Sequence, residues 1–297
     1  MSTRALSHSI DGVTLQLSHP VELPIEWVGR EELKLQLLAA WLVLADEDVP
    51  LTPRLTGKPG VGKTTLAYAV GRSLGREVYL LQATMDTRPE DLIVTPVIGD
   101  DSKLRYVASP IVTAMIRGGV CVLDEGNRMS EKSWASLAPL LDARRYVESI
   151  VAGIRISAHR DFRLVATMNQ DASTFDLPEH IHSRLQPQIL IDFPDADEER
   201  LILKRVLPFS SDQVLDYVVS FLQLAHAADE RYTVRDGINI ARYALKSCAQ
   251  AAERGGKRDL KEALEESVEM TLGPEAKRYL EPAEMPRGPR GPARPKA

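Results

Sequence analysis

Residues 57–64 read Gly57-Lys58-Pro59-Gly60-Val61-Gly62-Lys63-Thr64. The stretch matches every fixed position of the phosphate-binding template GxxxxGK(S/T). Its glycines let the backbone turn its N–H groups inward, and the first turn of a following helix adds the positive end of the helix dipole. In this template Lys63 reaches the β- and γ-phosphates, and the Thr64 hydroxyl binds Mg²⁺. The stretch therefore predicts binding of a nucleoside triphosphate. A glycine-rich turn with an incidental lysine is the alternative.

The segments around this loop alternate between short apolar runs and helical patterns. Alternation of this kind is typical of an α/β fold in which helices cover a parallel sheet. From Asp195 onward only helical patterns remain, which predicts a smaller helical domain after the sheet domain. The expected strands cover residues 51–55, 78–81, 120–123, 162–166 and 189–191, and the expected helices include 31–45, 197–206, 211–228, 234–253 and 259–272.

The composition predicts four segments and an ordinary globular chain. We expect an N-terminal arm over residues 1–24, a nucleotide-binding α/β domain over 25–194, a helical lid domain over 195–281 and a disordered tail over 282–297. The tail holds five prolines and several arginines and cannot build a core. Of the 297 residues, 44% are apolar and 27% charged, values typical of a globular protein.

Charge and cysteine content argue against several kinds of partner and site. The net charge of −5 provides no general attraction to nucleic acid or acidic membranes, so we expect neither as a partner. Cys121 and Cys248 lie far apart in the sequence, which argues against a disulfide framework or a zinc site. The N-terminal stretch lacks a signal pattern and no apolar run is long enough to span a membrane, so we expect a cytoplasmic protein.

Two further apolar runs end in polar side chains suited to triphosphate chemistry. Val120–Leu123 is followed by Asp124 and Glu125, and a parallel strand aims its last residues at the crevice where ligands bind. Asp124 can then hold Mg²⁺, and Glu125 can take a proton from an attacking water. Asn169 ends the run that follows and can orient that water if its strand lies between the other two. A solvated strand end and a simple turn are the alternatives.

Taken together, these motifs resemble the AAA+ ATPases, and the stretch Asp124-Glu125-Gly126-Asn127-Arg128 resembles the MoxR branch of that family. The resemblance covers roughly residues 25–275. It implies a P-loop NTPase (AAA+) sheet domain with strand order 5-1-4-3-2, followed by the helical lid. It also implies ATP as the substrate and Mg²⁺ as the cofactor.

The resemblance also implies roles for individual residues. Arg184 looks like the arginine finger that completes the active site of a neighbouring subunit, and Arg235 like the lid arginine that senses the γ-phosphate. Each arginine could instead pair on a helix surface. Catalytic roles are implied for Lys63, Glu125, Asn169, Arg184 and Arg235, and metal binding for Thr64 and Asp124. Nucleotide contacts are implied for Val28, Gly29, Gly57, Lys58, Pro59, Gly60, Val61, Gly62, Lys63, Thr64 and Thr65.

The same resemblance implies an assembly and its partners. We expect a homo-oligomeric ring, a hexamer by resemblance, that remodels a client protein together with a von Willebrand factor A domain partner. Two expected hairpins, at residues 93–108 and 145–157, resemble insertions that face the ring opening in the MoxR branch. Their tyrosines, Tyr106 and Tyr146, either touch the client or pack on their own hairpins. A nucleic-acid motor and a nucleotide-gated scaffold with little turnover remain the alternatives, and a small-molecule kinase is a weaker one.

Overall fold

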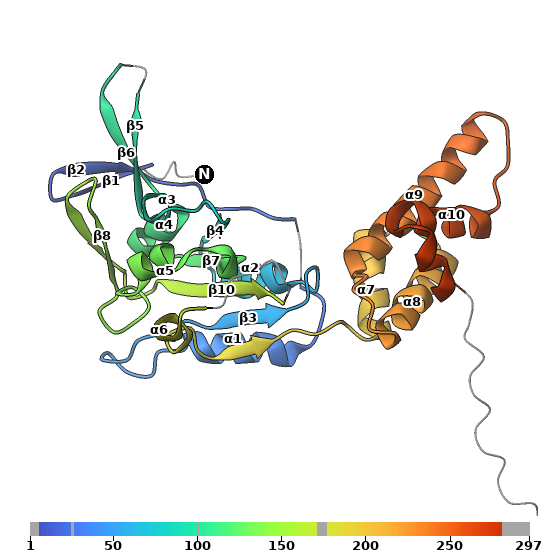
Figure 1. Ribbon diagram of the computed structural model, residues 1–297, viewed down its shortest axis with the longest axis horizontal. Coiled ribbons are helices and arrows are strands. Elements are labelled where there is room, and N and C mark those ends of the chain that lie inside the picture. Colours follow the sequence, from blue (N-terminus) through green and yellow to red (C-terminus); the bar gives the residue numbers. More distant parts are fainter. Residues whose placement is uncertain (1–5, 25–26, 100, 171–176, 281–297) are drawn as a thin grey trace, which may run out of the picture. The chain divides into compact units, whose positions relative to one another are not determined.

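The computed structural model describes residues 6–24, 27–99, 101–170 and 177–280, and these form two compact units (Figure 1). The first unit ends at Asp192 and the second begins at Phe193. The expected tail at 282–297 lies outside the described residues, as do residues 1–5 of the expected arm. Among the described residues, no helix is both long and apolar enough to cross a membrane.

A five-stranded parallel sheet forms the centre of the first unit. Its strand order is β11-β3-β10-β7-β4, which is 5-1-4-3-2 when the strands are counted along the chain, so the expected order is confirmed. The register pairs Asn169 with Gly57 and Ala166 with Leu123. The five strands are β3 (Arg54–Gly57), β4 (Val78–Gln82), β7 (Val120–Asp124), β10 (Arg163–Asn169) and β11 (Gln188–Leu190).

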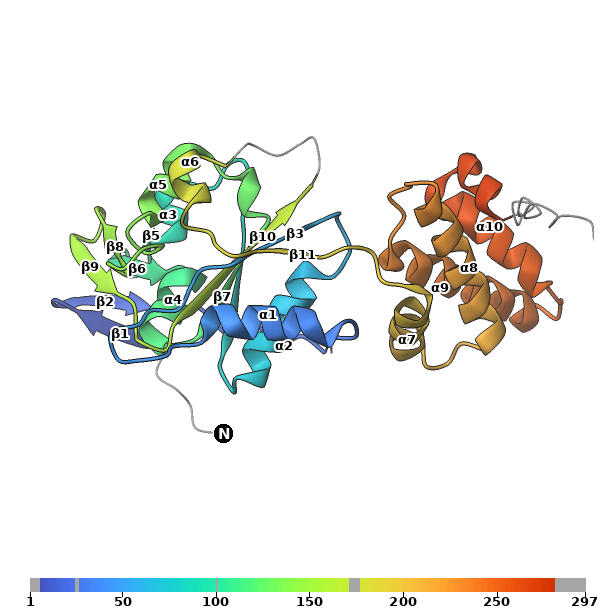
Figure 2. The ribbon, with the colours of Figure 1, turned by 90° about the horizontal axis from the view of Figure 1, so that it is seen from below.

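Helices cover both faces of this sheet (Figure 2). Helix α2 lies on the face where Val78 and Val120 point, while α4 packs on the opposite face with Leu123 and Tyr79. Helix α4 is capped at its N-terminus by Ser109, whose hydroxyl accepts a hydrogen bond from the Val112 N–H at 3.1 Å. The helices of this unit are α1 (Glu31–Trp41), α2 (Lys63–Ser73), α3 (Pro89–Leu92), α4 (Pro110–Arg117), η1 (Gly126–Arg128), α5 (Glu131–Leu137) and α6 (Glu179–His182).

Residues 7–16 of the expected arm belong to a second sheet in the same unit. The strand β2 pairs with β6 in parallel, so this sheet has the order β1-β2-β6-β5, and the side chain of Leu15 is fully buried. Both expected hairpins are present, as β5–β6 and β8–β9. The strands are β1 (Ser7–Ile10), β2 (Val13–Gln16), β5 (Val94–Ile98), β6 (Leu104–Ala108), β8 (Tyr146–Ser149) and β9 (Ile154–Ser157).

Two of the elements expected in the first unit extend over exposed apolar residues that the observed elements leave out. The helix predicted to reach Ala45 ends at Trp41, and Leu42 and Leu44 beyond it are 61% and 81% exposed. The strand predicted from Leu51 begins only at Arg54, with Leu51 54% exposed. Leucine-rich sequence therefore marked these segments as structured, although their apolar side chains do not all enter the core.

The second unit is helical within its described residues and has its own apolar core. Capping boxes start two of its helices: Asp195 with Glu198 at α7, and Thr233 with Asp236 at α9. Phe221 and Leu222 of α8 belong to the buried apolar cluster of this unit. The elements are α7 (Ala196–Val206), α8 (Asp212–Ala227), α9 (Val234–Glu253), α10 (Leu260–Leu272) and η2 (Pro274–Tyr279).

Candidate active site at the phosphate-binding loop

The phosphate-binding loop connects β3 to α2 at the carboxyl edge of the central sheet. Gly60 and Gly62 have φ values of 81° and 94°, in the left-handed region that favours glycine. At Gly57 a Cβ atom would lie 2.1 Å from the carbonyl oxygen of Ile191, so a larger residue does not fit there. Lys58, Pro59 and Val61 stand between these glycines.

Lys63 is the first residue of α2, and its side chain folds back into the loop. Its ammonium donates hydrogen bonds to the carbonyl oxygens of Gly57 at 2.9 Å and Lys58 at 2.7 Å. Only 6% of the residue is exposed. The positive charge therefore lies inside the loop, at the end of β3, where the template predicts that phosphate binds.

Three oxygen-bearing side chains meet beside the loop, one each from α2, β7 and β10. The Thr64 hydroxyl donates to Oδ1 of Asp124 at 2.7 Å, and the Thr167 hydroxyl donates to the same oxygen. Thr64 and the neighbouring Thr65 lie in the first turn of α2. Hydroxyl and carboxylate oxygens are the ligands that Mg²⁺ prefers, together with phosphate oxygens of a substrate. The donor set at Thr64 and Asp124 thus fits Mg²⁺.

Glu125 lies next to Asp124 and is held by its neighbours. Its backbone is in the left-handed region, with φ 55° and ψ 38°, and its N–H donates to the Thr167 hydroxyl at 3.0 Å. One carboxylate oxygen accepts from the Asn169 amide at 3.1 Å, and the other lies 2.5 Å from Nε of Arg128. The predicted base and the predicted water-orienting amide are therefore in direct contact.

Asn169 is fixed in turn by a second amide. The Asn127 amide donates to the backbone oxygen of Asn169 at 2.8 Å, and Asn127 Oδ1 accepts from the Asn169 N–H at 3.3 Å. Both residues are buried, with 7% and 9% of their surface exposed. Asn127 thereby ties the turn after β7 to the end of β10.

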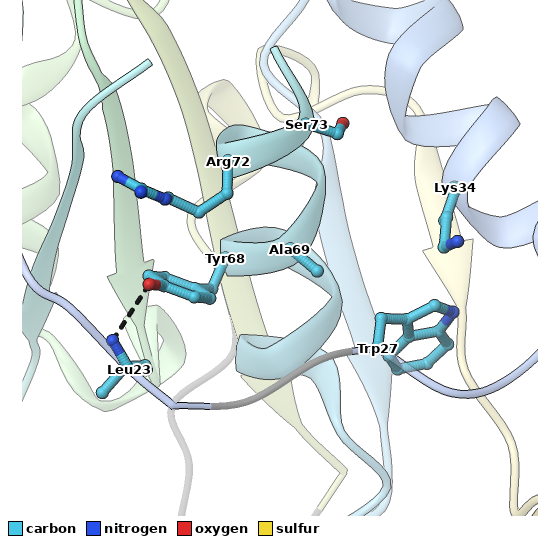
Figure 3. Close-up of a pocket in the computed structure, with 7 residues that line it drawn as sticks. All are labelled: Leu23, Trp27, Lys34, Tyr68, Ala69, Arg72 and Ser73. Carbon is cyan, nitrogen blue, oxygen red and sulfur yellow. Dashed lines mark hydrogen bonds between the residues drawn. The ribbon is translucent and has the colours of Figure 1, made fainter. Parts of the chain in front are cut away.

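Val28 and Gly29 come close to the loop through their neighbour Trp27. A Cβ atom added at Gly62 would lie 3.1 Å from the Trp27 indole, and one added at Gly29 would lie 2.8 Å from the same ring. The indole therefore packs between the loop and the segment that contains Val28. It also lines a cavity of about 450 Å³ along the outer side of α2 (Figure 3). The lining residues are Leu23, Trp27, Lys34, Tyr68, Ala69, Arg72 and Ser73.

The two predicted arginines belong to other segments of the chain. Arg184 follows α6, and its guanidinium contacts Asp142 at 3.5 Å and the carbonyl oxygen of His180. Arg235 lies in the second unit, in the first turn of α9. Their roles toward a γ-phosphate stay predictions.

Four residues of this site were not predicted from the sequence: Trp27, Asn127, Arg128 and Thr167. Asn127 and Arg128 stood within the quoted Asp-Glu-Gly-Asn-Arg stretch, so a signal was present but no role was assigned. Thr167 lies two residues before Asn169, and in a strand that spacing places both side chains on the same face of the sheet. This alternation could have identified Thr167.

The hairpin tyrosines pack within their own unit. Tyr106 is half-buried against the core, and the Tyr146 ring lies beneath Arg155, whose Cζ is 4.4 Å from its centroid. The exposed apolar side chains are instead at the hairpin tips: Ile98 is 79% exposed and Ile150 95%. The structure therefore favours the packing role for both tyrosines.

Comparisons with known proteins agree with this geometry. Residues 54–185 match the AAA domain (dynein-related subfamily), a range that begins with β3 and ends just after Arg184. Protein MoxR of Paracoccus denitrificans is 32% identical over 151 residues, which are 50% of this chain and 43% of that protein. Von Willebrand factor A domain-containing protein 8 of Mus musculus is 27% identical over 213 residues, 65% of this chain and 11% of that protein. The matches thus span well under two thirds of either relative's length.

A solved structure shows the same fold. The Holliday junction branch migration motor RuvB of Thermotoga maritima superposes with a TM-score of 0.55 at 19% identity, covering 82% of this chain and 70% of that chain. This likeness supports the P-loop sheet domain followed by a helical part.

Proposed function

Because this chain is an AAA+ protein of the MoxR type, we propose that it hydrolyses ATP with Mg²⁺ and uses the energy to remodel a client protein. The observation that carries the hydrolytic part is the convergence of two pairs at one sheet edge. Thr64 meets Asp124 at 2.7 Å, and Asn169 meets Glu125 at 3.1 Å. The first pair is suited to a metal ion and the second to an attacking water.

Each residue has a distinct task in the proposed reaction. Lys63 and the loop N–H groups hold the phosphates, while Thr64 and Asp124 would hold Mg²⁺. When bound, Mg²⁺ neutralises charge on the β- and γ-phosphate oxygens. Glu125 accepts a proton from water as the water attacks the γ-phosphorus, and Asn169 orients that water. The adenine base of ATP would bind beside Val28 and Gly29, toward the cavity lined by Trp27.

Assembly is the second part of the proposal. Arg184 would stabilise the transferring phosphoryl group of a neighbouring subunit, which requires a ring, and we propose a hexamer in the cytoplasm. Arg235 would contact the γ-phosphate from the lid. A partner with a von Willebrand factor A domain is proposed because the family resemblance implies one and because a relative carries that domain in its name. A client would meet the exposed hairpin tips at Ile98 and Ile150.

Steady-state hydrolysis by substituted proteins tests the reaction. Glu125→Gln should bind ATP normally but lose roughly 10²-fold or more in turnover, since a general base contributes about that much. Lys63→Ala should lose ATP binding itself. Glu131→Gln removes an exposed carboxylate six residues further along and should behave as the unsubstituted chain. Normal turnover by a Glu125→Gln protein that binds ATP would contradict the proposed mechanism.

A further inference from the structure

Arg184 is held within its own subunit by two acceptors. Its Nη1 donates to the carbonyl oxygen of His180, and its Nε lies 3.5 Å from Oδ2 of Asp142. A guanidinium carries five N–H donors in a rigid fork, so these two contacts leave donors that can reach another group. The side chain is 30% exposed. Arg184 is thus oriented by its own subunit while it faces solvent in part.

The carboxylate that contacts Arg184 is itself fixed by its local turn. Oδ1 of Asp142 accepts from the Arg144 N–H at 3.0 Å, which closes a turn ahead of the β8–β9 hairpin. The Arg144 guanidinium clamps the same carboxylate with two hydrogen bonds of 2.9 and 2.8 Å. These bonds from Arg144 lower the pKa of Asp142 to about 2, so the carboxylate stays ionised in the neutral range.

The two arginines bind this carboxylate unequally. Arg144 makes a bidentate pair at hydrogen-bond distance, whereas Arg184 makes one contact at 3.5 Å. If Arg184 turned toward a phosphate, Asp142 would still be paired with Arg144 and no carboxylate would be left unsatisfied. Asp142 can therefore orient the Arg184 side chain and still allow its guanidinium to turn toward a phosphate.

We propose that Asp142 is a positioning residue that aims Arg184 at the nucleotide of the neighbouring subunit. The inference rests on the proposed role of Arg184 as a finger in trans. Asp142 then serves a site on another subunit and contributes nothing to hydrolysis of the nucleotide bound by its own chain. A merely structural role, in which Asp142 only closes the turn before β8, would impair the subunit that carries the substitution.

Subunit mixing separates these two roles. Asp142→Asn keeps the shape of the side chain and removes its charge, and by itself should lower turnover about tenfold, because small misplacement of a catalytic group is costly. The KM for ATP should stay unchanged, since binding uses the subunit's own loop. A subunit with Glu125→Gln cannot hydrolyse ATP but still offers an intact Arg184. Mixing it with Asp142→Asn subunits should raise the turnover per Asp142→Asn chain severalfold.

Two further variants make the result decisive. A mixture of Arg184→Ala and Glu125→Gln subunits should gain activity in the same way. The size of that gain is the reference for the gain of the Asp142→Asn mixture. Glu148→Ala removes another carboxylate from the β8–β9 hairpin, one paired with Arg155 at 2.6 Å, and should keep full turnover. If Asp142→Asn by itself retains full turnover, the inference about Asp142 is wrong. It is also wrong if only the Arg184→Ala mixture regains activity, although that result would support the proposed role of Arg184 as a finger. If neither mixture recovers, the proposed role of Arg184 fails and the inference fails with it.

Discussion

The backbone of Glu125 has a conformation that few residues other than glycine adopt. Its φ of 55° places it in the left-handed region, which costs a non-glycine residue roughly 1–3 kcal/mol. The contacts from Thr167, Asn169 and Arg128 hold it there. Strain of this kind persists where surrounding contacts over-determine the geometry, which is common at active sites. The proposed base is thus held in a defined orientation before substrate binds.

A buried carboxylate in the second unit lies far from this chemistry in sequence. Glu199 of α7 is fully buried and accepts a hydrogen bond from Gln223 at 2.9 Å. Its other carboxylate oxygen lies 3.6 Å from Nδ1 of His226. Phe193 stacks on the His226 ring, with 3.8 Å between the ring centroids. Burial raises the pKa of Glu199 from its ordinary value of 4.5 to about 7.

Glu199 should make the stability of the second unit depend on pH. With its pKa raised on folding, the folded state binds more protons than the unfolded state between about pH 4.5 and about pH 7. The free energy of unfolding should therefore fall as pH rises through this window, by up to about 3 kcal/mol, and level off above it. Glu199→Gln should flatten that slope.

Urea unfolding measured at several pH values checks this prediction. All three tryptophans, Trp27, Trp41 and Trp134, precede Asp192, so their fluorescence reports on the first unit alone. Far-ultraviolet circular dichroism reports on both units. A change in circular dichroism that occurs without a change in fluorescence therefore reports unfolding of the helical unit. An equal pH slope in the parent chain and the Glu199→Gln chain would refute the assignment to Glu199.

At the scale of elements, helix α2 approaches the sheet at a glycine. A Cβ atom at Gly71 would lie 2.9 Å from Cγ2 of Val78 and 3.3 Å from Cβ of Val120. Glycine is a poor helix former, about 1 kcal/mol worse than alanine, so helix propensity alone would favour Ala here. Close packing of α2 on β4 and β7 explains the glycine, and this packing also positions the loop at the start of α2.

Gly71→Ala should consequently destabilise the first unit by roughly 1–2 kcal/mol, since overpacking outweighs the gain in helix propensity. In a double-mutant cycle, Val78→Ala should relieve the contact, so that the two substitutions together cost less than the sum of their separate effects. Tryptophan fluorescence in urea measures each free energy. If the two free-energy changes simply add, the close contact between Gly71 and Val78 is not the cause of the destabilisation.

Elements differ in how far the sequence alone could place them. The loop, the Asp124-Glu125 strand end and both hairpins were predictable because each depends on local spacing or turn residues. The pairing of β2 with β6 was not, because it joins residues about ninety positions apart and has no local pattern. The contact of Arg184 with Asp142 was hidden for the same reason, since 42 positions separate the two residues. Contacts of this kind depend on how distant segments pack together, and a single sequence does not show that packing.

At the scale of the whole molecule, the residues proposed to take part in hydrolysis are divided between the two units. The first unit carries the loop, the proposed metal ligands, the proposed base and Arg184, while Arg235 belongs to the second unit. Each unit has its own apolar core, so each is a separate folded body. In the proposed ring, loss of phosphate would be sensed through Arg235 of the same chain and Arg184 of the next one. Hydrolysis is then a property of an assembly.

Turnover per chain as a function of chain concentration, with assembly followed by sedimentation, tests this claim most directly. Turnover should rise steeply as assemblies form and then level off. Arg184→Ala should assemble over the same concentrations yet remain slower by about 10³-fold, within the range that an arginine finger contributes. A monomer that hydrolyses ATP at a constant rate per chain, undiminished by Arg184→Ala, would contradict the account.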